Sequence, residues 1–360
     1  MPSVITAPAL KAGATIAFIS PSSRLNNVFP AAIARSEALL SSRGYQVRIF
    51  FTPDQGCIQS SIANRHAEIR SAFLDPSISA VICTIGGGAF TELLPVLLRD
   101  RELHAGIRAN PKIVVGMSDN TGLHWFLYGL VGLRTFYGPS AIPELGTADD
   151  ITDEASPLAF CVRSLFNAIA APVPLGDVPR SAVYAPKAPP FFFHDPASTA
   201  VQDVVPAPPW HWLRRGQAEG RLFGGFLLTV PRLNGVRALA PDWRGRIVFL
   251  ETSQGDESGD DVSLVRIAVA DLLAQGVFEE AAGLVVGRAF GYDTEERREQ
   301  FAGVFRELLC EGERGKEKEF PILLNVDIGH TTPMVTLPFD VLARLDSERD
   351  QFTILESGVS

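Results

Sequence analysis

The sequence predicts an α/β protein of two domains, in which an N-terminal domain built on a parallel sheet precedes a smaller, mixed α/β and partly barrelled C-terminal domain. Three observations lead to this prediction. The chain has 360 residues, 46% of them apolar and 20% charged, which is enough for about two globular domains at roughly 150 residues each. Its first third alternates β-rich and helical stretches. A proline-rich segment then separates that third from a second half with a different pattern.

Short β-rich runs and helical stretches alternate in the first third. The predicted strands lie at 15–19, 46–50, 80–84 and 113–115. Between them, the apolar spacing at 31–43 and 61–73 is that of helices, and Gly44 is a suitable C-cap for the first of these. Strands that alternate with helices in this way predict a parallel sheet covered by helices on both faces.

A proline-rich segment follows. Ten of the 26 prolines fall between Pro172 and Pro209, a density that sustains neither a helix nor a central strand. We therefore expect a linker or surface loop between the domains. The predicted division is an N-terminal domain at 1–170, a proline-rich linker at 171–215 and a C-terminal domain at 216–360.

The second half is predicted to contain both strands and helices. The expected strands lie at 222–230, 246–250, 283–286, 322–326 and 334–337. Helices are expected at 262–273 and 295–309. The charge run at 311–319 is typical of a solvated turn or helix end.

Composition and charge exclude several classes of partner. The net charge of −9 gives no cationic field that would attract nucleic acid. The four cysteines show no metal-site or disulfide spacing, so we expect no structural zinc, no obligatory disulfide and a reducing compartment. No run reaches the ~18 apolar residues of a membrane span. These features predict a cytoplasmic protein that binds neither membrane nor nucleic acid.

The segment 112–124 is the most informative for chemistry. An apolar strand delivers Ser118 to a turn after Gly116, and helical spacing resumes at Thr121. A serine at such a strand end resembles a nucleophile elbow, in which a helix start can also stabilise an oxyanion. The pattern G-x-S-x-G is half met, because Asn120 replaces its second glycine. A simple helix N-cap explains the same residues.

A second strand-to-helix turn carries three glycines. Gly86, Gly87 and Gly88 follow the predicted strand at 80–84, and glycines there allow the backbone to approach a ligand closely. The turn has neither the dinucleotide pattern G-x-G-x-x-G nor a phosphate-binding loop with Lys-Ser/Thr. Half of an oxyanion hole, a phosphate cradle and a turn that simply requires positive φ all remain open.

A serine nucleophile needs a base, and the base usually needs an acid that orients it. His330 is the best placed of the six histidines, because it follows a predicted strand and precedes a turn. Glu251 ends the apolar run 246–250, where a carboxylate has no obvious packing role and is usually paired or functional. Spacing alone does not show that Ser118, Glu251 and His330 converge.

Together these residues make the sequence resemble the LD-carboxypeptidase family of serine peptidases (family S66), including the microcin C immunity peptidases. The matching blocks include Leu93-Leu94-Pro95, Gly116-Met117-Ser118-Asp119-Asn120-Thr121, Tyr137-Gly138-Pro139, Gly224-Gly225, Phe249-Leu250-Glu251 and Gly329-His330-Thr331-Thr332-Pro333. They stand in the family's order and span nearly the whole chain.

The resemblance implies a fold and a mechanism. The implied fold pairs a Rossmann-like or flavodoxin-like sheet domain with a smaller C-terminal domain, commonly as a homodimer. The implied chemistry uses no metal and no cofactor. Ser118 is the nucleophile, His330 the base, and Glu251 the acid that orients it. The backbone N–H groups of Asp119 and Gly87 would form the oxyanion hole.

Some positions depart from the family and affect the expected substrate. Phe226 replaces the asparagine usual after the paired glycines, and Gly88 begins an unusually apolar turn. The proline-rich segment is similar to that of the immunity branch, where an aromatic stacks on a nucleotide base. Trp210 is the candidate, with domain-interface packing as the alternative. Gly86 and Phe226 are further candidates for substrate binding.

Three functions follow from these features. The leading one is a serine carboxypeptidase or amidohydrolase that cleaves either a muropeptide bond or an aminoacyl-nucleotide. The second is a small-molecule binding protein on the same scaffold, in which Phe226 marks lost catalysis. The third, a dinucleotide enzyme built on the Gly86 turn, is the least supported.

Overall fold

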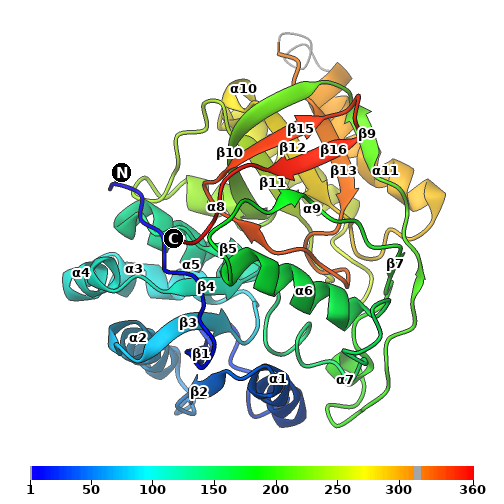
Figure 1. The fold of residues 1–360 in the computed structure, drawn as a ribbon. Coiled ribbons are helices and arrows are strands. Elements are labelled where there is room, and N and C mark those ends of the chain that lie inside the picture. Colours follow the sequence, from blue (N-terminus) through cyan, green and yellow to red (C-terminus); the bar gives the residue numbers. More distant parts are fainter. Residues whose placement is uncertain (1, 312–317) are drawn as a thin grey trace.

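The computed structural model describes residues 2–311 and 318–360 and contains two large sheets (Figure 1). One sheet with its helices forms the lower half of the view, and the other forms the upper half. Most of the charge run predicted at 311–319 lies outside the described residues.

The first sheet has six strands in the order β14-β5-β4-β3-β1-β2. Its strands are β1 (Thr15–Ile19), β2 (Gln46–Phe50), β3 (Ile78–Cys83), β4 (Ile113–Gly116), β5 (Phe136–Tyr137) and β14 (Leu337–Pro338). Strands β1 to β5 run parallel, and β14 pairs antiparallel with β5. The predicted parallel sheet is therefore confirmed, with one added strand from the C-terminal part of the chain.

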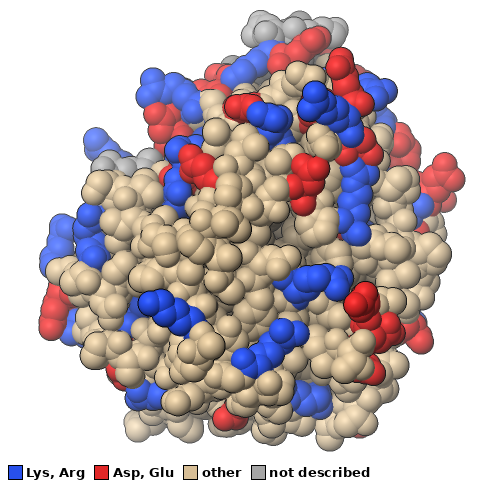
Figure 2. Space-filling view, viewed as in Figure 1, with Lys and Arg blue, Asp and Glu red and all other residues tan. Residues whose placement is uncertain are grey.

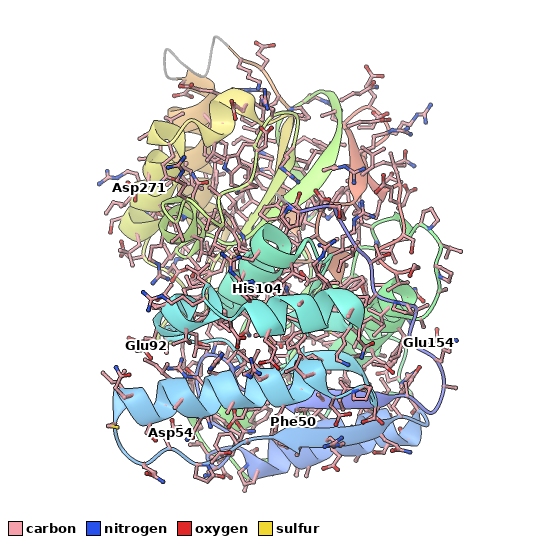
Figure 3. The ribbon with its side chains drawn as sticks, turned by 90° about the vertical axis from the view of Figure 1, so that its left-hand side faces the viewer. Phe50, Asp54, Glu92, His104, Glu154 and Asp271 are labelled. Atoms are coloured by element: carbon pink, nitrogen blue, oxygen red, sulfur yellow. The ribbon has the colours of Figure 1, made fainter. Side chains whose placement is uncertain are left out.

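Helices cover both faces of this sheet. The helical segments are α1 (Pro30–Ser42), α2 (Ile58–Leu74), a 3-10 turn (Phe90–Leu93), α3 (Leu94–Leu97), α4 (Arg101–Ala109), a 3-10 turn (Ser118–Asn120), α5 (Thr121–Phe126), a π turn (Leu127–Val131) and α6 (Pro157–Ile169). Because side chains alternate along a strand, β1 packs Ala17 and Ile19 against α2, α4 and α5. It packs Ile16 and Phe18 against α1 and α6 on the other face. Figure 3 shows α2 and α4, the helix that carries His104, side by side on the first face.

The second sheet has eight strands in the order β6-β16-β15-β10-β11-β12-β13-β9. These are β6 (Gly176–Asp177), β9 (His211–Arg214), β10 (Gln217–Phe226), β11 (Ile247–Glu251), β12 (Gly283–Gly287), β13 (Ile322–Val326), β15 (Leu342–Asp346) and β16 (Gln351–Ile354). Strands β10 to β13 are parallel and the outer pairs antiparallel. The sheet curls into a half-barrel, which confirms the mixed, partly barrelled domain.

Short helices complete the second half. They are α8 (Val230–Asn234), α9 (Val262–Ala274), α10 (Val277–Glu280), α11 (Glu295–Arg306) and a π turn (Glu307–Glu311). The proline-rich segment at 171–215 forms short pieces. It contributes β6 and β9 to the second sheet, and it also contains β7 (Val183–Tyr184), α7 (Pro190–Phe193) and β8 (Val205–Pro206). The division at 170 and 215 stays a prediction.

Two predicted strands differ from the structure. The strand expected at 222–230 begins earlier, at Gln217, and ends at Phe226, where a turn leads into α8. Of the strand expected at 334–337, only Leu337 lies in a strand. The N–H groups of Met334 and Thr336 donate to side chains of α6 at 3.2 and 2.8 Å, so they are unavailable to a strand ladder.

Basic and acidic residues are interspersed on the face shown in Figure 2, with no large area of one sign. No helix of the described chain is long and apolar enough to cross a bilayer. Cys57, Cys83, Cys161 and Cys310 are free thiols.

Candidate active site

Ser118 lies in a strained turn after β4. Its φ of 60° is in the left-handed region that non-glycine residues rarely adopt. Two hydrogen bonds hold it there: the Ser118 N–H donates to the Tyr137 hydroxyl at 2.8 Å, and the Thr121 hydroxyl donates to the Ser118 carbonyl at 2.6 Å. The side chain is therefore presented at the carboxyl end of β4.

The glycine turn after β3 lies directly against this serine. A Cβ on Gly86 would lie 2.7 Å from the Ser118 Oγ, so only glycine fits there. Gly87 has a φ of 138°, and its Cβ would lie 2.9 Å from the Ser22 Oγ. A Cβ on Gly88 would meet no atom within 4 Å. Gly86 and Gly87 thus have steric reasons to be glycine, whereas Gly88 has none.

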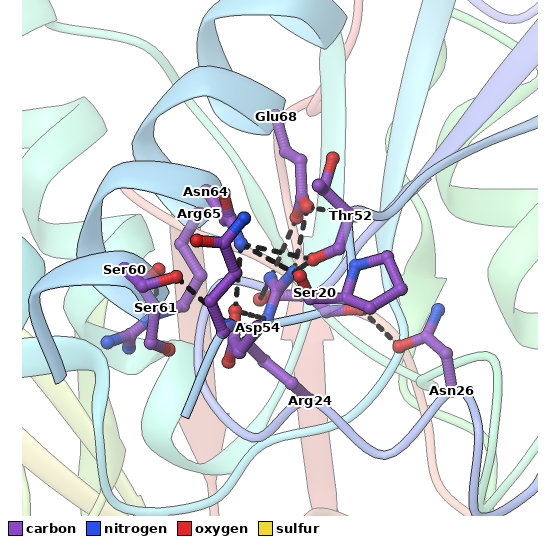
Figure 4. Close-up of polar contacts among 12 residues, drawn as sticks. Ser20, Arg24, Asn26, Thr52, Asp54, Ser60, Ser61, Asn64, Arg65 and Glu68 are labelled. Atoms are coloured by element: carbon purple, nitrogen blue, oxygen red, sulfur yellow. Dashed lines mark hydrogen bonds and ion pairs between the residues drawn. The ribbon is translucent and has the colours of Figure 1, made fainter. Parts of the chain in front are cut away.

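A buried polar network supports the two loops around these glycines (Figure 4). The Arg65 guanidinium donates to the carbonyls of Pro21 and Ala89 at 3.4 and 2.9 Å. The neighbouring Arg24 pairs with Glu68 at 2.8 Å. Because the donors reach loops on both sides of the glycine turn, this network fixes the turn relative to α2.

The Asp119 carboxylate also holds the neighbouring loops in place through hydrogen bonds. It is fully buried, and its Oδ2 accepts from the Ser22 hydroxyl at 2.5 Å and from the Phe90 N–H at 2.8 Å. The side chain of Asp119 is thus used for positioning. Its backbone N–H would lie 3.2 Å from a Cβ on Gly86, on the same side as Ser118.

Glu251 and His330 form a pair on the second sheet. Glu251 ends β11 and is fully buried, and its Oε2 lies 2.7 Å from the His330 Nδ1. Gly329 has a φ of 98°, and a Cβ on it would lie 2.7 Å from the Glu251 Cβ. A glycine is therefore required for His330 to reach Glu251.

The environment of His330 favours its protonated form. Burial lowers the pKa of the imidazole, but the charge of Glu251, the hydrogen bond to it and the charge of Glu144 outweigh burial, so the pKa of His330 is raised above 6.5. His330 is 12% exposed, which leaves part of its ring accessible. An imidazole held in this way can accept a proton and stabilise the resulting charge.

Ser118 and His330 meet at a cavity of about 250 Å³. Its lining comes from Ser23, Leu25, 85–87, Met117, Ser118, Ser140, Pro143, Glu144, Phe192, Phe226, 253–255 and His330. The cavity lies where the carboxyl ends of β3 and β4 face those of the second sheet, the usual place for a ligand site in parallel sheets.

The structure brings most of the candidate residues together. Gly86 and Gly87 line the cavity with Ser118 and His330. Phe226 also lines it, and its ring packs edge-on against the His330 ring, with the two ring centroids 5.9 Å apart. Glu251 lies behind His330, where one carboxylate oxygen accepts from the Tyr137 hydroxyl and the other contacts the His330 Nδ1.

Two of the candidates for substrate binding do not line this cavity. Gly88 is absent from its lining, and so is Trp210. The Arg180 guanidinium covers the Trp210 ring, with its Cζ 3.6 Å from the ring centroid. The ring also packs against the main hydrophobic core. An aromatic of the proline-rich segment does line the cavity, but it is Phe192 of α7.

Sequence reasoning missed three residues at this site. Tyr137 donates to the Glu251 Oε1 and accepts from the Ser118 N–H, so it joins the serine turn to the acid. Its only sequence signal is its place in the Tyr-Gly-Pro block. Glu144 and Phe192 line the cavity, and nothing in their local sequence indicates it.

The remaining ionisable groups do not suggest a metal. Within residues 2–311 and 318–360, no three His, Cys, Asp or Glu side chains are grouped so that they could hold an ion. His124 is buried between the Thr135 hydroxyl and the Gly116 carbonyl at 2.9 Å each, and burial lowers its pKa to about 4. It is therefore a neutral structural histidine.

Two family models match most of this chain. Residues 16–138 match the LD-carboxypeptidase N-terminal domain, and residues 219–345 match the LD-carboxypeptidase C-terminal domain. A carboxypeptidase homologue of Vibrio cholerae serotype O1 is 28% identical over 359 residues, 99% of each chain. The microcin C7 self-immunity protein MccF of Escherichia coli is 27% identical over 364 residues, covering 99% of this chain and 97% of MccF.

Solved structures show the same fold. MccF in its apo state superimposes with a TM-score of 0.81 at 24% identity, over 99% of this chain and 100% of that one. An MccF-like protein from Bacillus anthracis gives 0.82 at 23% identity, over 98% and 100% of the two chains. The family matches cover both halves of the chain. The chain therefore belongs to the LD-carboxypeptidase family of serine peptidases, family S66, and is an enzyme of that class.

Proposed function

We propose that this enzyme hydrolyses an amide bond through an acyl-enzyme, with Ser118 as nucleophile, His330 as general base and Glu251 as the acid that orients it. One observation carries the proposal: Ser118 and His330 line the same cavity, and the His330 Nδ1 is held by a fully buried carboxylate. A nucleophile, a base and an orienting acid are the parts that serine hydrolysis requires.

The reaction follows from these positions. The His330 Nε2 takes the proton of the Ser118 hydroxyl as the Oγ attacks the substrate carbonyl carbon. The tetrahedral intermediate collapses as His330 returns that proton to the leaving amine, which leaves an ester on Ser118. Water, deprotonated by His330, then attacks the ester. His330 returns this proton to the Ser118 Oγ as the bond between Oγ and the acyl carbon breaks and the acid is released. The charge of Glu251 and its hydrogen bond to the imidazole raise the pKa of His330, and they stabilise the imidazolium that forms in both acylation and deacylation.

The N–H groups of Asp119 and Gly87 are the proposed oxyanion donors. The Ser118 N–H is already bound to Tyr137, so it is not a candidate. The Gly86 carbonyl accepts from the Ser23 N–H at 3.0 Å. Because a trans peptide points its C=O and the next N–H in opposite directions, the Gly87 N–H points away from Ser23.

The proposed substrate is a small peptide-like or aminoacyl-nucleotide molecule. A Bacillus subtilis relative described as a probable murein peptide carboxypeptidase is 24% identical over 98% of this chain and 94% of its own. MccF has been solved in complex with aspartyl sulfamoyl adenosine. If the substrate is a nucleotide, Phe192 is better placed than Trp210 to stack on its base, because only Phe192 lines the cavity. A cytoplasmic homodimer remains part of the proposal.

A turnover assay tests the mechanism. Wild type and Ser118→Ala are incubated with a tetrapeptide ending in D-Ala and with aspartyl sulfamoyl adenosine, and the products are identified by mass. We expect cleavage of one of them by the wild type and none by the variant. A fluorophosphonate should label Ser118 in native protein and no serine after denaturation. Failure of both cleavage and labelling in folded protein refutes the proposal and favours a binding protein.

A further inference from the structure

The ionisable groups of the catalytic cavity are unevenly charged. Two titratable side chains, Glu144 and His330, line it, and no lysine or arginine of the described chain does. A substrate carboxylate in this cavity would face Glu144 without a lysine or arginine to pair with. A substrate ammonium would face a carboxylate that no lysine or arginine of the described chain neutralises.

Glu144 is buried and is only partly used by the protein. It is 6% exposed, and its Oε2 accepts from the Ser140 N–H at 2.7 Å. Among residues 2–311 and 318–360, no lysine or arginine forms an ion pair with it. The nearby Ser140 hydroxyl is buried with no hydrogen-bond partner in the same part of the chain. A buried carboxylate and a buried hydroxyl with free capacity are costly unless a ligand completes them.

We propose that Glu144 is a specificity residue that binds an ammonium group on the acyl part of the substrate, assisted by the Ser140 hydroxyl. This inference rests on the proposed function of the same cavity and narrows its substrate class. The cavity of about 250 Å³ is smaller than the ~300–1,000 Å³ of common ligand pockets. Because Ser118 and Glu144 line the same small cavity, an amine on the acyl group can approach Glu144 when the carbonyl lies at Ser118.

The electrostatics of the cavity agree with this role. Burial raises the pKa of Glu144 to about 7, while the Ser140 N–H and the charge of His330 act in the opposite direction and the charge of Glu251 adds to the rise. Glu144 therefore ionises near neutral pH in the free enzyme. An ammonium ligand would favour the ionised form and be bound more tightly as pH rises through this range.

The Glu144→Gln variant separates recognition from a purely structural role. Glutamine keeps the shape and an acceptor for the Ser140 N–H but loses the charge. Glu154→Gln is the matched control, because it removes one negative charge from an exposed side chain visible at the edge of Figure 3. Circular dichroism of each variant shows whether the fold is kept.

Two pairs of probes compare a ligand that carries an ammonium group with a ligand that lacks it. The first pair is the tetrapeptide L-Ala-D-Glu-L-Lys-D-Ala and its norleucine counterpart, which differ in a side-chain ammonium. The second pair is aspartyl sulfamoyl adenosine and its desamino analogue, which differ in an α-ammonium. The dissociation constant of each probe is measured by calorimetry with Ser118→Ala, and kcat/KM is measured with the active enzyme.

We expect one pair to show about 10- to 100-fold tighter binding of its ammonium-bearing member, the factor of a charge-assisted hydrogen bond. The preference should grow between pH 6 and pH 8, persist in Glu154→Gln and disappear in Glu144→Gln. The pair that shows it identifies the source of the amine. Equal binding within both pairs, no binding of any probe, or a preference that survives Glu144→Gln overturns the inference. Preferential binding without turnover in the active enzyme supports the inference and counts only against the proposed hydrolysis.

Discussion

Replacing Glu144 by glutamine should stabilise the free enzyme at alkaline pH and much less at acidic pH. The pKa of Glu144 is raised from 4.5 to about 7, chiefly by burial. A folded-state pKa above the unfolded one means that the folded state binds more protons between these values, so stability falls as pH rises from 4.5 to about 7. Glutamine has no proton to lose and escapes this penalty.

The size of the effect follows from the shift. At ~1.4 kcal/mol per pKa unit, the ionised carboxylate costs about 3 kcal/mol at pH 8 and less than about 1 kcal/mol at pH 5. With an unfolding entropy of ~2.1 cal/mol/K per residue, the variant should melt about 4 °C above the wild type at pH 8 and about 1 °C above it at pH 5.

Differential scanning fluorimetry of wild type, Glu144→Gln and Glu154→Gln across this pH range measures the effect. The Glu154 variant should follow the wild type at every pH, since its side chain is exposed. A difference between wild type and Glu144→Gln that is constant with pH would refute the reasoning, because it would show that Glu144 is not held neutral by burial.

Three further predictions concern the geometry around the serine. Tyr137→Phe leaves the Ser118 N–H and a Glu251 oxygen buried without a partner, so urea unfolding should show a loss of about 2–4 kcal/mol and kcat should fall; an unchanged midpoint contradicts this. Gly86→Ala places a methyl 2.7 Å from the Ser118 Oγ and should lower kcat/KM by ~100-fold or more, while Gly88→Ala, with open space, keeps it; equal activities would rule out the steric argument. In Glu251→Gln the imidazole loses the charge that raises its pKa, so kcat should drop roughly 10²–10⁴-fold and the acidic limb of the pH profile should move to lower pH. An acidic limb that stays in place would show that another group sets it.

The parts of the site that lie at strand ends could be predicted from the sequence. Ser118, Glu251 and His330 each follow or end an apolar run, and a polar side chain at such a point has few reasons to be there other than pairing or chemistry. The structure places Glu251 and His330 in contact and puts His330 at the same cavity as Ser118. Their roles stay proposals until the variants are measured.

The parts that depend on packing between distant segments could not be predicted. The three residues Tyr137, Glu144 and Phe192 reach the site because of how β5, the loop after it and α7 are placed, and no periodicity encodes that placement. The sequence indicates Trp210 as the aromatic of the proline-rich segment, yet this side chain packs beneath Arg180 and does not line the cavity. An aromatic run such as 191–193 looks like core from sequence alone.

The serine and its proposed base lie on different sheets, so their relative position depends on the packing between the two halves. Two buried hydrogen bonds link α5 to the end of β10: the Trp125 indole donates to the Gly224 carbonyl at 2.9 Å, and the Phe226 N–H donates to the Thr121 hydroxyl at 3.0 Å. Tyr137 adds a third link through Glu251. Because each link involves a buried polar group, sliding one half past the other would leave several unpaired at once. These hydrogen bonds therefore oppose such sliding in the region where the proposed reaction requires close positioning.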